Sequence, residues 1–505
     1  MISLSRESDT LEVGDKRKAV TVSRRAWLTL AILSSTLLTV FFSETMLLPA
    51  IPEIIQDFKI PYGTAAWIFS AYLIVAAVMT PVAGRLSDLY GKKKVLLTLL
   101  IIYIAGLTAG GFADNISFLL VTRLIQGVGL AAVPAAFSLL RDTFPPSKLA
   151  IAVGVFGSAY SAGSVVGLLI GASIIHNYGW HATFLAIVPF SALVTLLIAR
   201  FVKENEKLNQ STTDAKDEKS VSNKKRRTFY IDIKGVLALS ATITSFLIAL
   251  TLIQVGISSE SLPLIVGAFI TSAISLSVFV FIEKRVIPPF FDLRLLRHNI
   301  LLPAFLLLIA AGITMFMIYP TIVQLVRSPE PLGFGGDSVD AANVQLPFMI
   351  VFLIFASITP FIINRIGSIK PIIIGGTISL FGAIGLLSFH STEFEVSTNL
   401  AIIASGLSLI TTSTWNLVVS SSPKEFTGIS VGIGALLLFI GMAIGPALAG
   451  VYMENHETVQ GIEGSYPSPG SYNLVFLTSG LLSAVSVGFG LALRRNTANK
   501  TIEVK

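Results

Sequence analysis

The apolar runs of this chain constrain its fold more than any other feature. An α-helix of about 20 apolar residues crosses the roughly 30 Å hydrocarbon layer of a bilayer. Only 13% of the residues are charged, against roughly 25% in an average soluble domain, and the mean hydropathy is +0.79. The sequence therefore predicts an all-α integral membrane protein with about fourteen transmembrane helices, at 27–49, 64–83, 95–113, 117–140, 150–175, 181–201, 234–255, 262–282, 300–323, 342–363, 369–389, 397–420, 428–452 and 472–493.

The distribution of basic residues predicts the orientation of these spans. An even number of spans places both termini on one side, and the loops on that side carry nearly all loop Lys and Arg, at 16–25, 92–94, 148, 224–227, 284–297, 370, 424 and 494–495. The opposite loops contain only Lys59 and Arg327. Because cytoplasmic loops are enriched in Lys and Arg, we expect a multi-pass plasma-membrane protein with both termini in the cytoplasm.

An internal repeat predicts how the spans are grouped. Thr80-Pro81 matches Thr359-Pro360, and the pattern Pro145…Gly154…Gly163…Gly167 matches Pro423…Gly432…Gly441…Gly445, at spacings of 279 and 278 residues. Such self-similarity indicates a parallel duplication of a six-helix unit, with two helices inserted between the copies. The polar segment 203–230 is typical of a flexible cytoplasmic linker. The predicted organisation is a tail (1–25), a six-helix bundle (26–202), the linker, two inserted helices (231–285), a second bundle (286–495) and a tail (496–505).

A short basic loop follows the second span, with the sequence Gly84-Arg-Leu-Ser-Asp88-Leu-Tyr-Gly91-Lys92-Lys93. Glycine permits a tight turn and a close approach of helices. Asp88 can cap a neighbouring helix, and the lysines can bind headgroups or carboxylates. An ordinary basic hairpin is the alternative interpretation. The spacing resembles the signature loop of the major facilitator superfamily, and this resemblance implies a gating role; Leu89 stands where that family usually has a basic residue, which weakens a charge relay through the loop.

Two further segments resemble motifs of the same family. Arg123-Leu-Ile-Gln126-Gly127-Val-Gly129 is similar to its R-x-x-Q-G-x-G motif, which the family links to proton coupling. The glycines of the fifth span resemble the family's antiporter motif, although Leu168 and Ala172 depart from it. Small residues four apart are also standard packing sites between membrane helices, which is the alternative interpretation. The glycine set and its second-half copy comprise Gly157, Gly163, Gly167, Gly171, Gly441, Gly445 and Pro446.

The first two spans resemble one subfamily more closely. The segments Glu44-Thr-Met-Leu-Leu-Pro49-Ala-Ile-Pro52 and Trp67-Ile-Phe-Ser-Ala-Tyr72, with the span count, are similar to the fourteen-helix drug:proton antiporters, which typically have aspartate where Glu44 stands. The resemblance implies proton-coupled efflux of hydrophobic or cationic small molecules by a monomer. Its partners would be the substrate, protons and the lipid bilayer, without a cofactor or a metal. Uptake of a small metabolite by a symporter or uniporter is the alternative.

Two ionisable residues lie well inside predicted spans. Glu44 lies about 25 Å from the cytoplasmic face and Arg123 about 10 Å from the outer face, at 1.5 Å per residue, so both fall in the outer half. Burial of a charged group is costly unless it is paired. Loss of water favours the neutral form of a carboxylic acid, and a nearby guanidinium favours the charged form. We therefore expect Glu44 to accept a proton or bind a cation and Arg123 to modulate it through an ion pair; snorkelling of Glu44 to the interface is the alternative.

Substrate contacts are less well defined by the sequence. Polar or amphipathic side chains within spans are the candidates, namely Tyr72, Gln126, Trp415 and Asn416. Trp27 and Trp180 lie at predicted span ends, where tryptophan commonly forms an interfacial belt.

A membrane-bound enzyme or a sensor is a remote alternative, and other function classes find little support in the sequence. The five histidines are isolated and no H-E-x-x-H segment occurs, which argues against a metalloenzyme. The absence of a G-x-x-x-x-G-K-[ST] segment argues against an ATP-driven pump. The net charge of +7 comes from basic residues at helix ends, so it does not indicate nucleic-acid binding. The chain contains no cysteine, which excludes disulfides.

Overall fold

The computed structural model describes residues 22–203, 233–254, 260–286, 298–422, 427–453, 456–457 and 466–503. Fourteen helical spans within these residues are long and apolar enough to cross a membrane, which confirms the predicted number. The predicted linker at 203–230 lies outside the described residues except for its first residue, as do most of the N-terminal tail and the last two residues of the C-terminal tail.

The first bundle contains eight α-helices and one short 3₁₀ helix, because two of its predicted spans are interrupted. Its elements are α1 (Arg24–Thr45), η1 (Leu48–Ala50), α2 (Ile51–Phe58), α3 (Tyr62–Tyr90), α4 (Lys92–Gly110), α5 (Ile116–Gly127), α6 (Ala132–Thr143), α7 (Pro146–Tyr178) and α8 (Trp180–Phe201). Two hairpins turn at a single glycine, Gly91 with φ 96° and Gly179 with φ 77°. Only glycine adopts these angles without strain, so the sequence itself fixes both turns.

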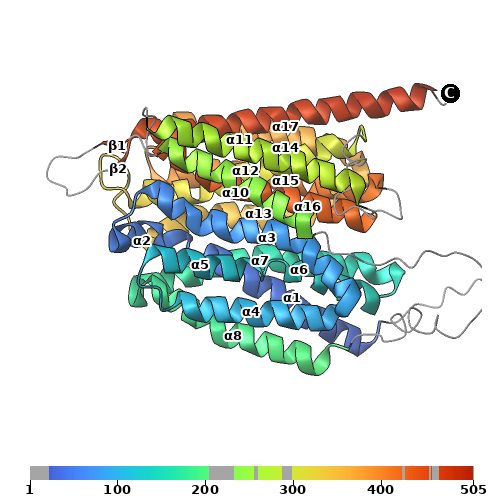
Figure 1. Ribbon diagram of the computed structural model, residues 1–505. Helices are drawn as coiled ribbons and strands as arrows, with labels where there is room; N and C mark the ends of the chain where they lie inside the picture. Colours follow the sequence, from blue (N-terminus) through green and yellow to red (C-terminus); the bar gives the residue numbers. More distant parts are fainter. Residues whose placement is uncertain are drawn as a thin grey trace, which may run out of the picture.

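The second bundle and the inserted helices complete the chain. The inserted pair is α10 (Ile233–Gln254) and α11 (Ser261–Arg285), and the second bundle comprises α12 (Leu301–Arg327), α13 (Ser338–Ile366), α14 (Ile369–Ser388), α15 (Glu393–Ser421), α16 (Thr427–Met453) and α17 (Pro469–Glu503). A two-stranded hairpin of β1 (His456–Glu457) and β2 (Tyr466–Pro467) precedes α17. The start of α1 and the end of α17 lie at the same end of the molecule (Figure 1).

The two bundles repeat one packing arrangement, as the sequence repeat predicts. In the first bundle α7 packs along α1, and in the second α16 packs along α12. A Cβ on Gly163 would lie 2.5 Å from the carbonyl oxygen of Leu38, and a Cβ on Gly441 would collide with the carbonyl oxygen of Ile309. The absence of a side chain at both glycines therefore allows each pair of helices to approach closely.

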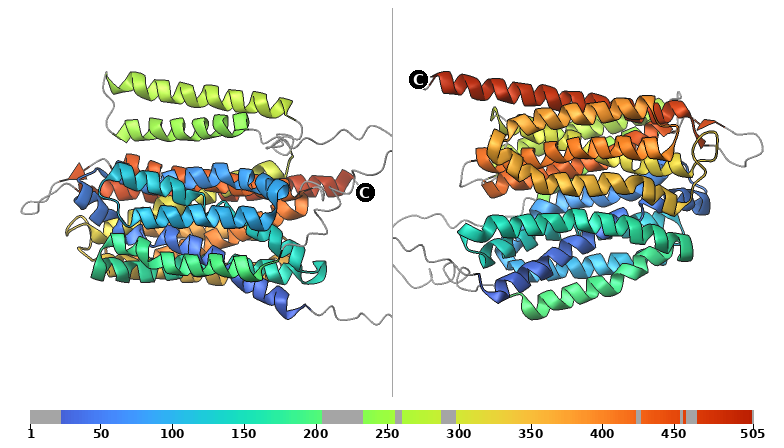
Figure 2. Two further views of the ribbon diagram at one scale, coloured as in Figure 1. Left: turned by 60° about the horizontal axis from the view of Figure 1, so that its bottom comes forward. Right: turned by 180° about the vertical axis from the view of Figure 1, so that it is seen from behind.

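The inserted pair α10–α11 lies beside the two bundles rather than within either one (Figure 2). Helix α10 contacts α3 of the first bundle and α16 of the second. The indole Nε1 of Trp67 on α3 donates a hydrogen bond of 2.7 Å to Thr251 Oγ1 on α10. The pair thus covers the junction between α3 and α16 and is attached to the first bundle.

Two charged contacts join the bundles at the end that holds α2 and the β-hairpin, which we call the α2 end (Figure 1). There the Arg327 Nη1 atom lies 2.9 Å from Glu53 Oε1, and His176 Nδ1 lies 3.1 Å from Asp337 Oδ2. Each contact joins one bundle to the other, and the second is an ion pair when the imidazole of His176 is protonated. Under the predicted orientation, the α2 end faces the cell exterior and is closed in this conformation.

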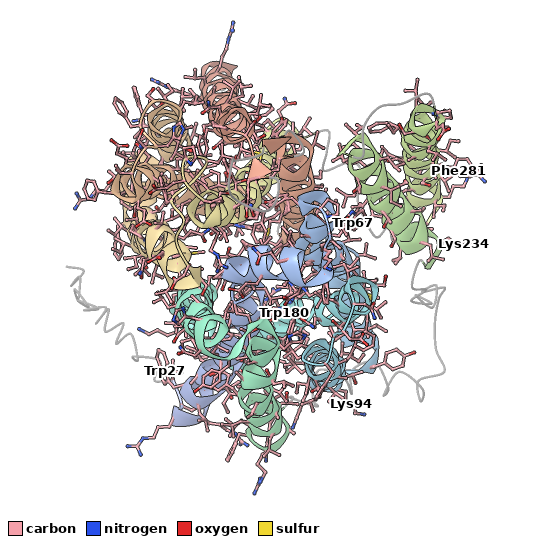
Figure 3. All side chains as sticks on the ribbon, turned by 90° about the vertical axis from the view of Figure 1, so that its left-hand side faces the viewer. Trp27, Trp67, Lys94, Trp180, Lys234 and Phe281 are labelled. Atoms are coloured by element: carbon pink, nitrogen blue, oxygen red, sulfur yellow. The ribbon has the colours of Figure 1, made fainter. Side chains whose placement is uncertain are left out.

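The two tryptophans expected at the interface differ in environment (Figure 3). Trp27 is 45% exposed, consistent with the prediction, whereas Trp180 is only 2% exposed. The indole Nε1 of Trp180 donates a hydrogen bond of 2.8 Å to Asp57 Oδ2, and its ring stacks on His181. The prediction of a belt role for Trp180 was wrong, because this residue anchors α2 to the start of α8.

Candidate functional site

Arg123 is fully buried on α5, where the guanidinium is held from three directions. Its Nε atom donates to the Ile68 carbonyl oxygen at 3.0 Å, and Nη1 donates to Gln126 Oε1 at 2.8 Å. The ring of Tyr72 lies against the guanidinium, with 4.2 Å between the Arg123 Cζ atom and the ring centroid. Such a cation–π contact is stronger when both groups are shielded from water. The Nη2 atom is buried and has no hydrogen-bond partner among the described residues.

Gln126 and Gly127 explain why Arg123 occurs in this particular sequence pattern. Gln126 lies one helical turn after Arg123, so its amide oxygen reaches Nη1, while its Nε2 atom donates to the Gly106 carbonyl oxygen at 3.0 Å. A Cβ on Gly127 would collide with the backbone oxygen of Tyr72. The glycine therefore lets α5 approach α3 closely enough for the arginine to reach the tyrosine ring.

Two tyrosines connect this arginine to α1. The hydroxyl of Tyr103 on α4 donates to the Thr39 carbonyl oxygen at 3.2 Å, and the Tyr72 hydroxyl lies 3.5 Å from the carbonyl oxygen of Val40. Both side chains are buried. Helices α3, α4 and α5 are thereby tied to the part of α1 that leads to Glu44.

Glu44 lies at the last turn of α1 and is almost completely buried. Its Oε1 atom has no hydrogen-bond partner among the described residues. Glu44 interacts electrostatically with Arg123, but the two side chains form no direct ion pair in the described part of the chain. The arrangement therefore contains a buried acceptor on Glu44 and a buried donor on Arg123 that both lack partners.

Tyrosines from both bundles interact with Glu44. Tyr160 on α7 and Tyr319 on α12 both interact electrostatically with Glu44. Tyr160 packs edge-on against Phe41 with 4.2 Å between ring centroids, and its hydroxyl lies 3.9 Å from the sulfur of Met315. The acid thus lies near the junction of the bundles, where major changes of contact accompany rocking of one bundle against the other.

The residues of the predicted gating loop stabilise the first bundle. Lys92 pairs with Asp142 at the end of α6, and the Nζ atom of Lys93 donates to the Ala199 carbonyl oxygen on α8 at 2.7 Å. Among the described residues, a Cβ on Gly84 would meet no atom within 4 Å, so no described helix packs closely there in this conformation. The Asp88 side chain lies outside the described part of the chain.

The glycines of the fifth span have a clear packing role. A Cβ on Gly167 would lie 2.5 Å from the Phe42 carbonyl oxygen, and a Cβ on Gly171 would lie 2.7 Å from the backbone of Met46. By contrast, a Cβ on Gly157 would meet no atom within 4 Å. In the second bundle, Gly445 approaches α12 in the same way, and Pro446 lies inside α16.

The four candidate substrate residues fall into two groups. Tyr72 and Gln126 are buried and engaged with Arg123, as described above. Trp415 is half-buried against Gly434 between α15 and α16, and Asn416 is exposed and accepts a hydrogen bond of 2.8 Å from the Ser368 hydroxyl. The structure therefore gathers Glu44, Arg123, Tyr72 and Gln126 into one region of the first bundle and leaves Trp415 and Asn416 in the second.

Several neighbours of the site were missed by the sequence analysis, namely Tyr103, Tyr160, Met315 and Tyr319. One signal was available for Tyr103: a Cβ on Gly129 would collide with its ring, so the second glycine of the arginine motif marks space for a bulky neighbour. The other three come from helices far away in sequence, and no local pattern distinguishes them from ordinary core residues.

Comparison with known proteins decides the family. The sequence model of the Major Facilitator Superfamily matches residues 33–446, well over half of the chain. The chain belongs to this superfamily of membrane transporters. Its substrates are accordingly small molecules.

Relatives and a solved structure extend this result. The chain is 26% identical to Multidrug resistance protein 3 of Bacillus subtilis, over 85% of this chain and 81% of that protein. It is 25% identical to the tetracenomycin C resistance and export protein of Streptomyces glaucescens, over 85% and 76%. The crystal structure of an auto-inhibited POT family peptide transporter superimposes with a TM-score of 0.63 at 16% identity, covering 94% of this chain and 97% of that one. The last similarity concerns the fold alone.

Proposed function

We propose that this transporter is a proton-coupled efflux antiporter for hydrophobic or cationic small molecules, with Glu44 as the proton acceptor and Arg123 as its modulator. The observation that carries the proposal is the burial of Glu44, whose carboxylate oxygen Oε1 has no hydrogen-bond partner among the described residues, and its electrostatic interaction with a tyrosine of each bundle, Tyr160 on α7 and Tyr319 on α12. A carboxylate within apolar surroundings attracts both protons and organic cations, and aromatic faces bind cations further.

The same residues support competition between proton and substrate. When Glu44 is protonated, the buried site holds no net negative charge and a cationic substrate loses its partner. When Glu44 is ionised, either a cation or the Arg123 guanidinium can neutralise it. If the transporter opens to each side of the membrane in turn, the proton and the cationic substrate replace each other at Glu44. One of them is then released on the side where the other binds.

The similarity to proteins named for multidrug resistance and for tetracenomycin C resistance and export supports the direction of transport. The proposal includes a plasma-membrane location with both termini in the cytoplasm and a monomeric functional unit. It also includes the domain limits 26–202 and 286–495, joined through the linker at 203–230 and the inserted pair.

Everted membrane vesicles with an imposed, inside-acid pH gradient test the proposal. We expect accumulation of lipophilic cations that a protonophore abolishes and that Glu44→Gln removes. Glu393→Gln is the matched control, because Glu393 is an exposed residue at the start of α15. Accumulation that survives Glu44→Gln with an unchanged pH dependence would refute the role of Glu44, and proton-driven movement only in the opposite direction would indicate uptake.

A further inference from the structure

We propose that Tyr72 is a positioning residue that holds Arg123 away from Glu44 and thereby sets the pH at which Glu44 exchanges its proton. The proposal rests on the proposed function. It assigns to Tyr72 a role different from the substrate contact that its sequence position suggested.

Three contacts hold the Arg123 guanidinium, two of them with α3. Two of its nitrogens donate hydrogen bonds, to the carbonyl oxygen of Ile68 and to the side chain of Gln126. The Tyr72 ring then covers the guanidinium at 4.2 Å from the Arg123 Cζ atom. Because Ile68 and Tyr72 both belong to α3, the guanidinium is retained against this helix and not against α1.

The position of Tyr72 is itself tightly restrained. The residue is fully buried, and Gly127 packs directly on its backbone. Its hydroxyl lies 3.5 Å from the Val40 carbonyl oxygen on α1. Tyr72 therefore has little freedom to move unless α1, α3 and α5 shift relative to one another.

Arg123 is the main charged group that interacts with Glu44. The titratable side chains that interact with it are Arg123 from α5, Tyr72 from α3, Tyr103 from α4, Tyr160 from α7 and Tyr319 from α12. Four of these are tyrosines, which are neutral at physiological pH. Arg123 is thus the one permanent charge in this set, and its approach to Glu44 determines how strongly the ionised carboxylate is favoured.

One atom of Glu44 and one of Arg123 could form a direct pair. Glu44 Oε1 and Arg123 Nη2 are both buried without hydrogen-bond partners among the described residues, and a direct pair would satisfy both. Loss of the Tyr72 ring frees the guanidinium to make this pair. A conformational change that shifts α3 against α1 achieves the same in the native protein and expels the proton from Glu44.

Titration of the Glu44 carboxyl by infrared spectroscopy tests the inference without any substrate. The purified protein is titrated while the C=O band of protonated carboxylic acids is recorded, and Glu44→Gln identifies the contribution of Glu44 to that band. We expect Tyr72→Leu to shift the midpoint of this contribution to lower pH by about one unit, the smaller end of the effect of an adjacent opposite charge. Tyr72→Phe keeps the ring and is expected to leave the midpoint in place.

The outcomes separate the inference from the proposed function. If Glu44→Gln removes no titrating band, the proposed function fails and with it the basis of the inference. If Glu44 titrates but Tyr72→Leu leaves the midpoint unchanged, only the inference is overturned. Tyr72→Met serves where Tyr72→Leu does not fold, since it also removes the ring while its longer, flexible chain adapts to the space that the ring leaves; the same shift is expected and its absence is equally decisive.

Discussion

The ion pair between Glu53 and Arg327 is expected to hold the α2 end of the transporter closed. Glu53 lies on α2 of the first bundle and Arg327 at the end of α12 in the second, with 2.9 Å between the charged atoms. Their side chains are 27% and 14% exposed. The second bridge, between His176 and Asp337, has exposures of 51% and 46%, so water screens it more strongly. We therefore assign most of the electrostatic closure to Glu53 and Arg327.

The magnitude follows from this partial burial. A hydrogen bond to a charged group contributes about 1.5–3 kcal/mol, and an exposed ion pair about 0–1 kcal/mol. A pair that is one-seventh to one-quarter exposed belongs between these ranges, at about 1–2 kcal/mol. Opening of the α2 end separates the pair, so Glu53→Gln is expected to raise the ratio of open to closed molecules about 5- to 30-fold.

Distances between spin labels measure that ratio directly. The chain contains no cysteine, so Tyr178→Cys and Phe394→Cys introduce two unique labelling sites at the α2 end, one in each bundle. Both side chains are largely exposed, at 79% and 80%. We expect Glu53→Gln to increase the long-distance population in double electron–electron resonance. The exchanged pair Glu53→Arg with Arg327→Glu is the control and should restore the short distance; an unchanged distribution in Glu53→Gln would refute the reasoning.

Two further predictions concern stability. The pKa of Asp337 lies below its ordinary value, mainly because the backbone N–H of Asp340 donates to its carboxylate. A second hydrogen bond from the Val339 N–H and the charges of His176 and Arg327 lower this pKa further, whereas burial raises it. A carboxylate with a depressed pKa stabilises the folded state at every pH above its ordinary pKa, and this stabilisation is lost as the pH falls through the depressed pKa. Asp337→Ala should therefore lower Tm at neutral pH. The difference in Tm from the native protein should shrink below about pH 4. Gly163→Ala places a Cβ 2.5 Å from the Leu38 carbonyl oxygen, and we expect a loss of about 1–3 kcal/mol of stability from overpacking. Gly157→Ala, where the Cβ meets no atom within 4 Å, should leave Tm in detergent nearly unchanged, and equal effects of the two substitutions would contradict the packing role.

The fourteen spans could be predicted because bilayer thickness dictates their length. Interruptions within spans could not. The first predicted span ran to Pro49, but α1 ends at Thr45 and the chain continues as η1 and α2, each of which has a proline in its first turn. Proline is well accommodated there and poorly within a helix. A hydropathy pattern does not reveal this break, because the sequence is apolar both in α1 and in η1.

The candidate site was only partly accessible from the sequence. Glu44 and Arg123 were recognisable because ionisable residues within spans are rare and costly. Their partners depend on how each helix is rotated about its axis, which an apolar sequence with little amphipathicity does not fix. The contact of Arg123 with Tyr72 instead of Glu44 is the clearest consequence, and it changes the expected ion pair into a pair of unpartnered groups.

The repeat also explains why coupling is expected in one bundle alone. Gly163 abuts Leu38 on α1, and its counterpart Gly441 abuts Ile309 on α12. Six residues further along, α1 carries Glu44 and α12 carries Met315. The duplication thus placed an acid on one side of the junction and a polarisable thioether on the other. Because methionine adapts its shape to irregular apolar surfaces and carries no proton, we infer that the first bundle exchanges the proton while the second contributes an apolar surface for the substrate.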